Sequence, residues 1–256
     1  MSSAGNTRPR RIEKNRAYRV IVAIGTVFLR LIAVRRDVRG LSHLPAGGGV
    51  VLAITHFGYL DFVLAEWAVF GHQRRYVRFM ATLKSFQHPI AGPLMRSMGH
   101  IPVDRSAGAS AYRFAIDALQ RGQLVGVFPE TRVSRSFTLL PFKNGAARMA
   151  ARSGVPIVPC VIWGSHRILT RTHTTSLRKS RRTPVTISFG EPLTVGPQDD
   201  PSVVTQALRV QMEAMLAAVQ ADYPVDGTGA WWQPAHLGGT APGEDLAREL
   251  DAADGP

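Results

Sequence analysis

His56 and Asp61 stand five residues apart, directly after an apolar run at residues 50–54. The run is typical of a short buried strand, and residues 61–70 have the spacing of an amphipathic helix. Histidine is the usual general base near neutral pH, and a carboxylate on its second ring nitrogen fixes the tautomer and stabilises the charged ring. The pair therefore predicts proton transfer at the end of a strand. The same spacing also fits a histidine held in a local turn beside an aspartate that caps a helix.

Charged side chains follow two other short apolar runs of the chain. Residues 99–103 lead into Arg105, and residues 124–128 lead into Glu130 and Arg132. Loops at strand ends are where α/β sheets place their functional groups, so these side chains would converge if the strands are neighbours. Two arginines could then clamp a phosphate through their fixed N–H groups. The alternative for each arginine is a solvated or ion-paired surface position.

Strand-like and helical patterns alternate along the middle of the chain, which indicates an α/β domain with helices on the faces of its sheet. We expect this domain to occupy residues 39–223. The predicted strands are residues 50–54, 76–80, 99–103, 124–128, 155–163 and 185–189. The predicted helices are residues 61–70, 89–97, 109–120, 144–152 and 202–220.

The 256 residues carry a net charge of +13, and this charge is unevenly distributed. Residues 224–256 hold six acidic residues and one arginine, a charge of −5, which leaves +18 on residues 1–223. The basic excess indicates a partner with negative charge: nucleic acid, an anionic membrane surface or a phosphorylated substrate. The Gly-, Pro- and Ala-rich acidic tail is expected to be mostly unpacked. Trp231 and Trp232 are the exception, because two adjacent tryptophans are expected to dock on the domain or at a lipid interface.

Residues 1–38 form an N-terminal segment in which basic residues precede an apolar run at residues 20–34. Arg30 interrupts this run after ten residues, whereas a membrane span needs about 20. A signal peptide is disfavoured because the small-residue cleavage site is missing. The pattern favours a helix that lies in the membrane interface, with a basic flank for anionic headgroups. An ordinary core helix with a frayed basic start is the alternative.

The remaining reactive residue types give weaker signals. A single cysteine excludes an internal disulfide framework, and Cys160 lies in an apolar run that is typical of a buried structural thiol. The histidines show no paired ligand spacing, so no metal site is expected.

These blocks, in this order, resemble the glycerolipid acyltransferase family, the 1-acylglycerol-3-phosphate acyltransferases and their relatives. The family shows a His-x4-Asp block, a Gly-x-Ile-x-x-x-Arg block, a Phe-Pro-Glu-Gly-Thr-Arg block and a Val-Pro-Ile-Val-Pro block. Their counterparts here lie at residues 56–61, 99–105, 128–132 and 155–159.

The sequence departs from the family pattern at two places. Thr55 and Gly58 stand where the family usually has Asn and Ser. The glycine after Glu130 is missing, so either Arg132 or Arg135 could take the phosphate-contacting role that the family's motif implies. These departures could mark a subfamily with a different acceptor.

The resemblance implies a single-domain mixed sheet flanked by helices, to which the N-terminal residue pattern adds a membrane-surface helix. It implies transfer of a fatty acyl group from acyl-CoA or acyl carrier protein to the free hydroxyl of a lysophospholipid. The default acceptor is 1-acylglycerol-3-phosphate, which would give phosphatidic acid. His56 is then the general base and Asp61 orients it. Implied substrate-binding residues are Lys84, Arg105, Glu130, Thr131, Arg132 and Arg135.

In this interpretation Glu130 binds acceptor hydroxyls or braces the arginines. The acyl donor is a co-substrate, and no cofactor or metal is expected. The protein is expected to be peripheral, on the cytoplasmic face of the cell membrane, with the anionic membrane surface as its partner.

Three other functions fit parts of the sequence. The acceptor could be another lyso-lipid or a glycolipid precursor. The protein could be an acyl hydrolase that uses the same His56–Asp61 pair, although the sequence has no Gly-x-Ser-x-Gly nucleophile elbow. The basic charge could belong to a non-enzymatic protein that binds nucleic acid or lipid. No nucleic-acid partner is expected, because zinc-finger spacing, an RNA-binding aromatic signature and a basic recognition helix are all missing.

Overall fold

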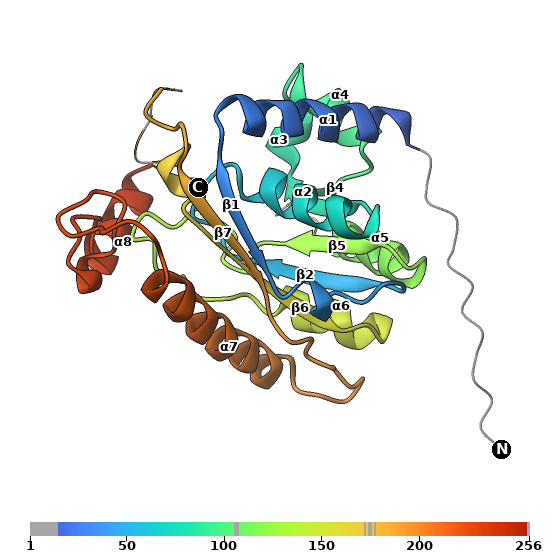
Figure 1. Cartoon of the computed structure of the whole chain (residues 1–256). Helices are drawn as coiled ribbons and strands as arrows, with labels where there is room; N and C mark the ends of the chain where they lie inside the picture. Colours follow the sequence, from blue (N-terminus) through green and yellow to red (C-terminus); the bar gives the residue numbers. More distant parts are fainter. Residues whose placement is uncertain (1–14, 105–107, 172, 174–175, 177, 255–256) are drawn as a thin grey trace.

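The computed structural model describes residues 15–104, 108–171, 173, 176 and 178–254. Its strands form one sheet in the order β1-β7-β6-β2-β5-β3-β4 (Figure 1). Their bounds are β1 Arg35–Arg39, β2 Val50–Ile54, β3 Val77–Thr82, β4 Ile101–Val103, β5 Leu124–Val127, β6 Ile157–Trp163 and β7 Pro184–Phe189. Neighbouring strands are parallel except for β6 and β7, which are antiparallel. The expected α/β class with a mixed sheet is therefore confirmed.

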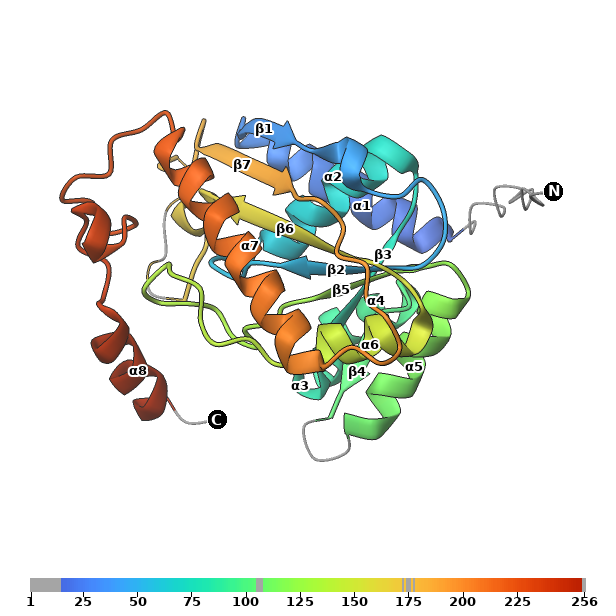
Figure 2. The same ribbon diagram turned by 90° about the horizontal axis from the view of Figure 1, so that it is seen from below.

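Helices cover both faces of the sheet. They are α1 Arg16–Leu31, α2 Asp61–Gln73, α3 Leu83–Gln87, α4 Ala91–Ser97, α5 Gly108–Gln120, α6 Gly145–Ser153, α7 Pro201–Ala221 and α8 Glu244–Ala253. Helices α1 and α2 lie on one face, whereas α6 and α7 lie on the other (Figures 1 and 2). Short 3-10 turns occur at η1 Leu41–His43, η2 Ser165–Arg167 and η3 Ala235–Leu237. None of the helices in the described ranges is long and apolar enough to span a bilayer.

Alternate side chains of the central strands enter two separate cores. In β2, Val51 and Ala53 pack with α5, α6 and α7, whereas Val50 and Leu52 pack with α2. Successive strand residues point to opposite faces, and both faces are covered here. This explains why β2 and β6 appear in the sequence as continuous apolar runs without alternation.

The parallel strands place several loops at one edge of the sheet. Because β2 lies between β5 and β6 and is parallel to both, the residues after all three strands emerge at the same edge. The residues after β5 and β6 thus lie near His56. The expected convergence of the loops therefore occurs for β2 and β5, whereas Arg105, after β4, lies outside the described residues.

Helix α1 packs on the domain through one side only. Asn15 caps its N-terminus by accepting a hydrogen bond from the Tyr18 backbone N–H at 3.0 Å. Tyr18 and Leu29 are fully buried, and the Tyr18 hydroxyl lies 2.8 Å from the Glu66 carboxylate on α2. The opposite side of α1 is exposed, so the helix combines a core face with an uncovered apolar face. The basic residues 1–14 lie outside the described range.

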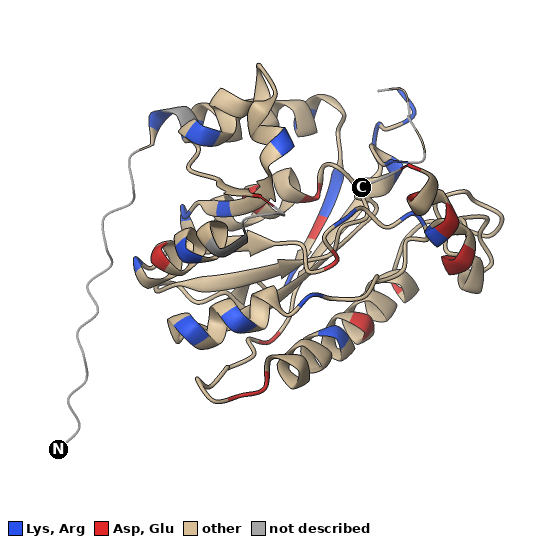
Figure 3. Cartoon of the chain, turned by 180° about the vertical axis from the view of Figure 1, so that it is seen from behind, with Lys and Arg blue, Asp and Glu red and all other residues tan. Residues whose placement is uncertain are grey.

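Two features differ from the sequence-based expectation. Strand β1 was not predicted, because Arg35–Arg39 has no apolar run; it lies at the sheet edge and pairs with β7 alone. The C-terminal tail is more packed than its composition indicated. Trp232 is 6% exposed and joins the core that α7 covers, and α8 buries Asp251. Figure 3 shows acidic positions grouped on α8, whereas basic positions are spread over the domain.

Candidate active site

His56 and Asp61 face one another at the edge of the sheet, just after β2. The Nδ1 atom of His56 lies 3.3 Å from Asp61 Oδ2. The Phe128 ring stacks on the imidazole with its centroid 4.0 Å away, which fixes the plane of the ring. The His56 side chain retains 18% exposure, and His56 lines a cavity. Its Nε2 atom, which makes no hydrogen bond to the described part of the chain, is available to a ligand there.

The carboxylate of Asp61 is held by several donors. Its Oδ2 atom accepts the backbone N–H groups of Phe57 at 2.9 Å and Gly58 at 2.8 Å. Its Oδ1 atom accepts a hydrogen bond from the Ser165 hydroxyl. The Asp61 side chain is fully buried, and it occupies the first turn of α2, where a negative charge is stabilised by the helix dipole. These contacts leave little freedom in where the carboxylate points.

Gly58 is explained by close packing against the segment after β6. A Cβ atom at this position would lie 2.9 Å from the His166 backbone nitrogen and 3.0 Å from the Leu169 carbonyl oxygen. Both atoms belong to the main chain, which cannot rotate away as a flexible side chain does. The other departure in this block, Thr55, accepts the Ile162 backbone N–H at 2.9 Å and so ties β2 to β6.

Glu130 supports the backbone of the site. Its Oε1 atom accepts the His56 backbone N–H at 3.0 Å, and its Oε2 atom accepts the Leu140 N–H at 2.9 Å. Burial raises its pKa to about 8. No ion pair joins Glu130 to an arginine among the described residues, and Glu130 is 2% exposed. Through these two contacts Glu130 positions the His56 backbone and the loop that follows β5.

Thr131 has a backbone φ of +62°, in the left-handed region. A β-branched residue is strained there, whereas glycine is not. A glycine, usual at this place in the family motif, would adopt this backbone conformation without strain, whereas the present chain has Thr131 there. Thr131 also lines the cavity beside His56.

A large cavity opens next to His56, with a volume of about 1090 Å³. Its wall is mainly apolar and comes from α1, α2, α4 and the loop after β5; it includes Ile21, Phe28, Phe62, Leu94, Met95 and Phe128. Ligand sites of drug-sized molecules usually measure about 300–1,000 Å³, so this cavity suits a long apolar ligand. His56 is one of the polar residues in this mainly apolar wall.

Arginines also line the cavity beside which His56 lies. Arg132 lines it and is 45% exposed, whereas Arg135 is 10% exposed and does not line it. Of these two alternatives, Arg132 is the one that lines the cavity. Arg171 and Lys143 also line the cavity. The sequence had indicated Arg171 only as part of a basic stretch, because nothing in its spacing relates it to His56.

Three further residue expectations can be placed on the structure. Lys84 is exposed on the short helix α3 and is not part of the cavity wall. Cys160 is fully buried, and burial followed by the Asp61 charge raises the pKa of its thiol, so the expected structural cysteine is confirmed. Within the described ranges, no cluster of three or more His, Cys, Asp or Glu could hold a metal ion.

Comparison with known proteins places the chain in a family. Residues 35–163 match the family model described as Acyltransferase. The chain is 33% identical over 125 residues to the 1-acyl-sn-glycerol-3-phosphate acyltransferase of Bacillus subtilis (strain 168), covering 48% of this chain and 60% of that protein. It is 29% identical over 139 residues to the chloroplastic enzyme BAT2 of the same name from Brassica napus, covering 53% of this chain and 39% of that protein. The chain thus matches at most about three fifths of these relatives' length.

The fold is similar to the crystal structure of the 1-acyl-sn-glycerophosphate (LPA) acyltransferase PlsC from Thermotoga maritima, with a TM-score of 0.65. The sequence identity is 20%, and the match covers 81% of each chain. At this identity the likeness concerns the fold. The family match spans β1 to β6 and includes His56, Asp61, Glu130 and Arg132. By its sequence and its fold, the chain belongs to the acyltransferase family.

Proposed function

We propose that this protein transfers a fatty acyl group from a thioester donor to the free hydroxyl of a lysophospholipid. The single observation that carries the proposal is that His56, paired with Asp61, lines an apolar cavity of about 1090 Å³. A base beside acyl-chain-sized space suits a reaction between a polar hydroxyl and a lipid thioester. The names of the relatives favour 1-acylglycerol-3-phosphate as the acceptor.

The mechanism needs one proton carrier. The His56 Nε2 atom removes the proton from the acceptor hydroxyl as its oxygen attacks the thioester carbonyl carbon. The C–S bond then breaks, and the departing thiolate takes the proton from the imidazolium. Asp61 holds Nδ1 and stabilises the charged ring during the transfer. The acceptor hydroxyl is itself the nucleophile, so no acyl-enzyme is needed, and the buried Cys160 takes no part.

Two arginines in the cavity wall support recognition of a phosphate. Arg132 and Arg171 line the same cavity as His56, and guanidinium groups bind phosphate through paired N–H donors. In this proposal the acceptor's phosphate lies at these arginines, and its acyl chain or that of the donor lies among the apolar side chains. Arg105 and Lys84 belong to the same proposal, as groups that would meet the headgroup or the donor.

The acceptor is tested with purified protein, one acyl-CoA or acyl carrier protein donor, and a panel of lyso-acceptors. Mass spectrometry of the products identifies which acceptor gains an acyl group. We expect 1-acylglycerol-3-phosphate to be converted to phosphatidic acid. If the thioester is consumed at the same rate with or without an acceptor, the protein is a hydrolase instead. If only a glycolipid precursor gains the acyl group, the acceptor is a glycolipid and not a lysophospholipid.

We also propose that the exposed face of α1 lies on an anionic membrane surface. Its outward apolar side chains are Val20, Ile24, Val27 and Leu31, which are 52–69% exposed. On the neighbouring helix α4, Leu94 is 43% exposed, and both helices contribute to the cavity wall. A lipid entering from the bilayer would then reach the cavity without crossing water. Arg16, Arg19 and Arg30 add positive charge to this helix for anionic headgroups.

Vesicle flotation tests this surface. The double variant Ile24→Glu/Val27→Glu should lose binding to vesicles that contain anionic lipid, because two charges enter the apolar face. The matched control is Val203→Glu/Val210→Glu on α7, where the two valines are 67% and 54% exposed on the opposite face of the sheet. Equal flotation of both double variants would contradict the docking face. A parallel DNA shift assay decides the nucleic-acid alternative.

A further inference from the structure

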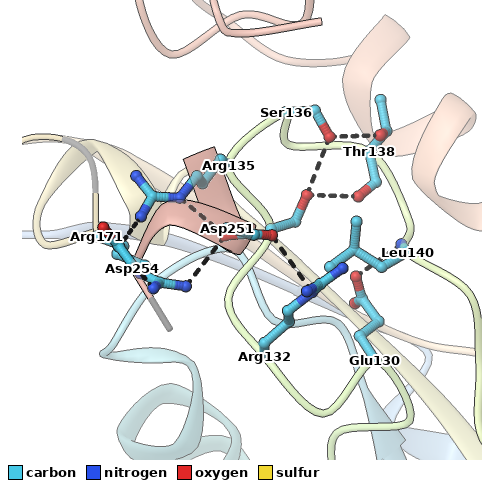
Figure 4. A network of polar contacts seen from close by, with 10 residues as sticks. Glu130, Arg132, Arg135, Ser136, Thr138, Leu140, Arg171, Asp251 and Asp254 are labelled. Atoms are coloured by element: carbon cyan, nitrogen blue, oxygen red, sulfur yellow. Dashed lines mark hydrogen bonds and ion pairs between the residues drawn. The ribbon is translucent and has the colours of Figure 1, made fainter. Parts of the chain in front are cut away.

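Three arginines converge on two carboxylates of the C-terminal helix (Figure 4). Asp251 Oδ1 accepts from Arg135 Nε at 2.9 Å and from Arg171 Nη1 at 3.1 Å, and its Oδ2 lies 3.3 Å from Arg132 Nε. Asp254 Oδ2 accepts from Arg171 Nη2 at 2.7 Å and also pairs with Arg135 Nη2. Two N–H groups each of Arg135 and Arg171 are therefore occupied by carboxylate oxygens.

This cluster lies at the boundary of the cavity. Arg132 and Arg171 line the cavity wall, and the side chain of Asp251 is only 4% exposed between the arginines. The paired N–H groups that hold the carboxylates are the groups with which arginine binds phosphate. The formal charge of the five side chains is +1, whereas the three arginines alone would present +3. A carboxylate from the same chain thus occupies a position suited to the oxygens of a phosphate.

Helix α8 is attached mainly through these ion pairs. Only Ala247 and Asp251 of α8 are buried, whereas Leu246 is 50% and Leu250 is 37% exposed. A helix held by a large apolar face would stay in place when one charge contact is lost. A helix held by charge can be released when another anion takes the arginines.

We propose that Asp251 and Asp254 compete with the acceptor's phosphate for Arg132 and Arg171, so that α8 sets the affinity of the site for phosphate-bearing acceptors. This inference rests on the proposed function for the identity of the acceptor. Its physical content, the competition between two carboxylates and a phosphate, can be measured without any acyl transfer.

Inorganic phosphate is the probe for a binding measurement by calorimetry on the full chain. The variant Asp251→Asn/Asp254→Asn removes both charges and keeps the side-chain shapes. We expect it to bind phosphate about tenfold more tightly than the unaltered protein, since the competing anions are gone. The matched control is Asp245→Asn/Glu249→Gln, which removes two charges from exposed positions on the same helix and should leave phosphate binding unchanged.

Equal phosphate affinity of the unaltered protein and of a folded Asp251→Asn/Asp254→Asn variant would overturn the inference. So would an equal gain in the control, because the effect would then reflect net charge alone. If the double variant does not fold, hydrogen exchange on the unaltered protein decides the question. Phosphate should speed the exchange of α8 amides relative to chloride at the same ionic strength, and the absence of any such change would refute the competition.

The activity assay separates this inference from the proposed function. With 1-acylglycerol-3-phosphate, the double variant should show a KM about tenfold lower than the unaltered protein, whereas the KM for a phosphate-free monoacylglycerol should not fall. Tighter phosphate binding without acyl transfer by any form of the protein would refute the proposed function and leave the competition standing. A KM that falls equally for both acceptors would contradict the competition.

Discussion

At the scale of single residues, the site is organised around one imidazole and the groups that fix it. Asp61 holds Nδ1, Phe128 stacks on the ring, and Glu130 holds the backbone N–H of His56. The spacing of His56 and Asp61 in the sequence predicted that the pair would meet, because both lie at the strand-to-helix junction. The roles of Glu130 and Ser165 could not be predicted, since their contacts depend on which strands are neighbours.

Gly58 provides a test of the packing behind this pair. The variant Gly58→Ser inserts the residue usual in the family, yet its Cβ would meet the main chain of the segment after β6 at 2.9–3.0 Å. Overpacking of this kind costs about 1–3 kcal/mol, so Tm should fall by about 2 °C or more. Gly47→Ser is the control, because a Cβ there meets nothing within 4 Å. Equal Tm values for the two variants would show that the loop relaxes freely.

A second residue-scale test concerns Ser165, which donates a hydrogen bond to Asp61 Oδ1. Ser165→Ala removes one bond to a charged acceptor without adding volume. If the loss of this bond raises the activation free energy by about 1.5 kcal/mol, because Asp61 then orients His56 less well, kcat should fall roughly tenfold. As a positioning effect, it should leave the KM of the thioester donor near its original value. A fall in Tm with unchanged kcat would assign Ser165 a structural role only.

At the scale of elements, the buried strands and amphipathic helices could be predicted from the sequence, whereas the charged edge strand β1 could not. The apolar runs of β2, β5 and β6 and the long helix α7 follow the expected positions closely. Strand β1 has no such pattern, because an edge strand with charged side chains buries little apolar surface. The connection of α1 to α2 through Tyr18 and Glu66 joins positions 48 apart in the sequence, which no local pattern indicates.

That connection predicts a dependence of stability on pH. Burial raises the pKa of Glu66 from 4.5 to about 8, so the native state keeps a proton that the unfolded chain loses above pH 4.5. This contribution to stability is therefore complete below about pH 4.5 and is lost as the pH rises towards 8, with a slope of up to about 1.4 kcal/mol per pH unit. Glu66→Gln should flatten the dependence in this window. Urea unfolding at several pH values measures it.

The control for Glu66 is Glu213→Gln on α7, a carboxylate that is 47% exposed and pairs with Arg209. Its removal should leave the slope between pH 4.5 and 8 unchanged. Glu130 has the same direction of shift, so part of the slope should remain in Glu66→Gln. A slope as steep as that of the unaltered protein would mean that Glu66 is ionised in the folded state.

At the scale of the whole molecule, the C-terminal segment is a part of the fold. Its composition predicted little packing, yet Trp232 enters the core and its carbonyl accepts a hydrogen bond from His166 Nε2 at 3.1 Å. Arg167 also lies over the Trp232 ring, 4.3 Å from its centroid. Composition does not reveal such docking, because it depends on a few positions, Trp232, Asp251 and Asp254 among them, within a Gly-, Pro- and Ala-rich segment.

Trp232→Ala tests how far this segment supports the domain. Removing a buried tryptophan costs about 3–5 kcal/mol, and the free energy of unfolding should fall by that amount. Trp231→Ala is the adjacent control: Trp231 is less buried and stacks on His173 at a centroid distance of 4.1 Å. A loss for Trp231→Ala as large as that for Trp232→Ala would contradict the assignment of Trp232 as the anchor.

The central claim is that His56 carries the proton in acyl transfer. The direct measurement is kcat/KM for ester formation, with products identified by mass, in His56→Ala and in the control His72→Ala, an exposed histidine in the last turn of α2. A positioned base contributes about 10²–10⁴-fold, so His56→Ala should lose at least about 100-fold while His72→Ala keeps the activity of the unaltered protein. Near-normal acyl transfer by a folded His56→Ala variant would contradict the account.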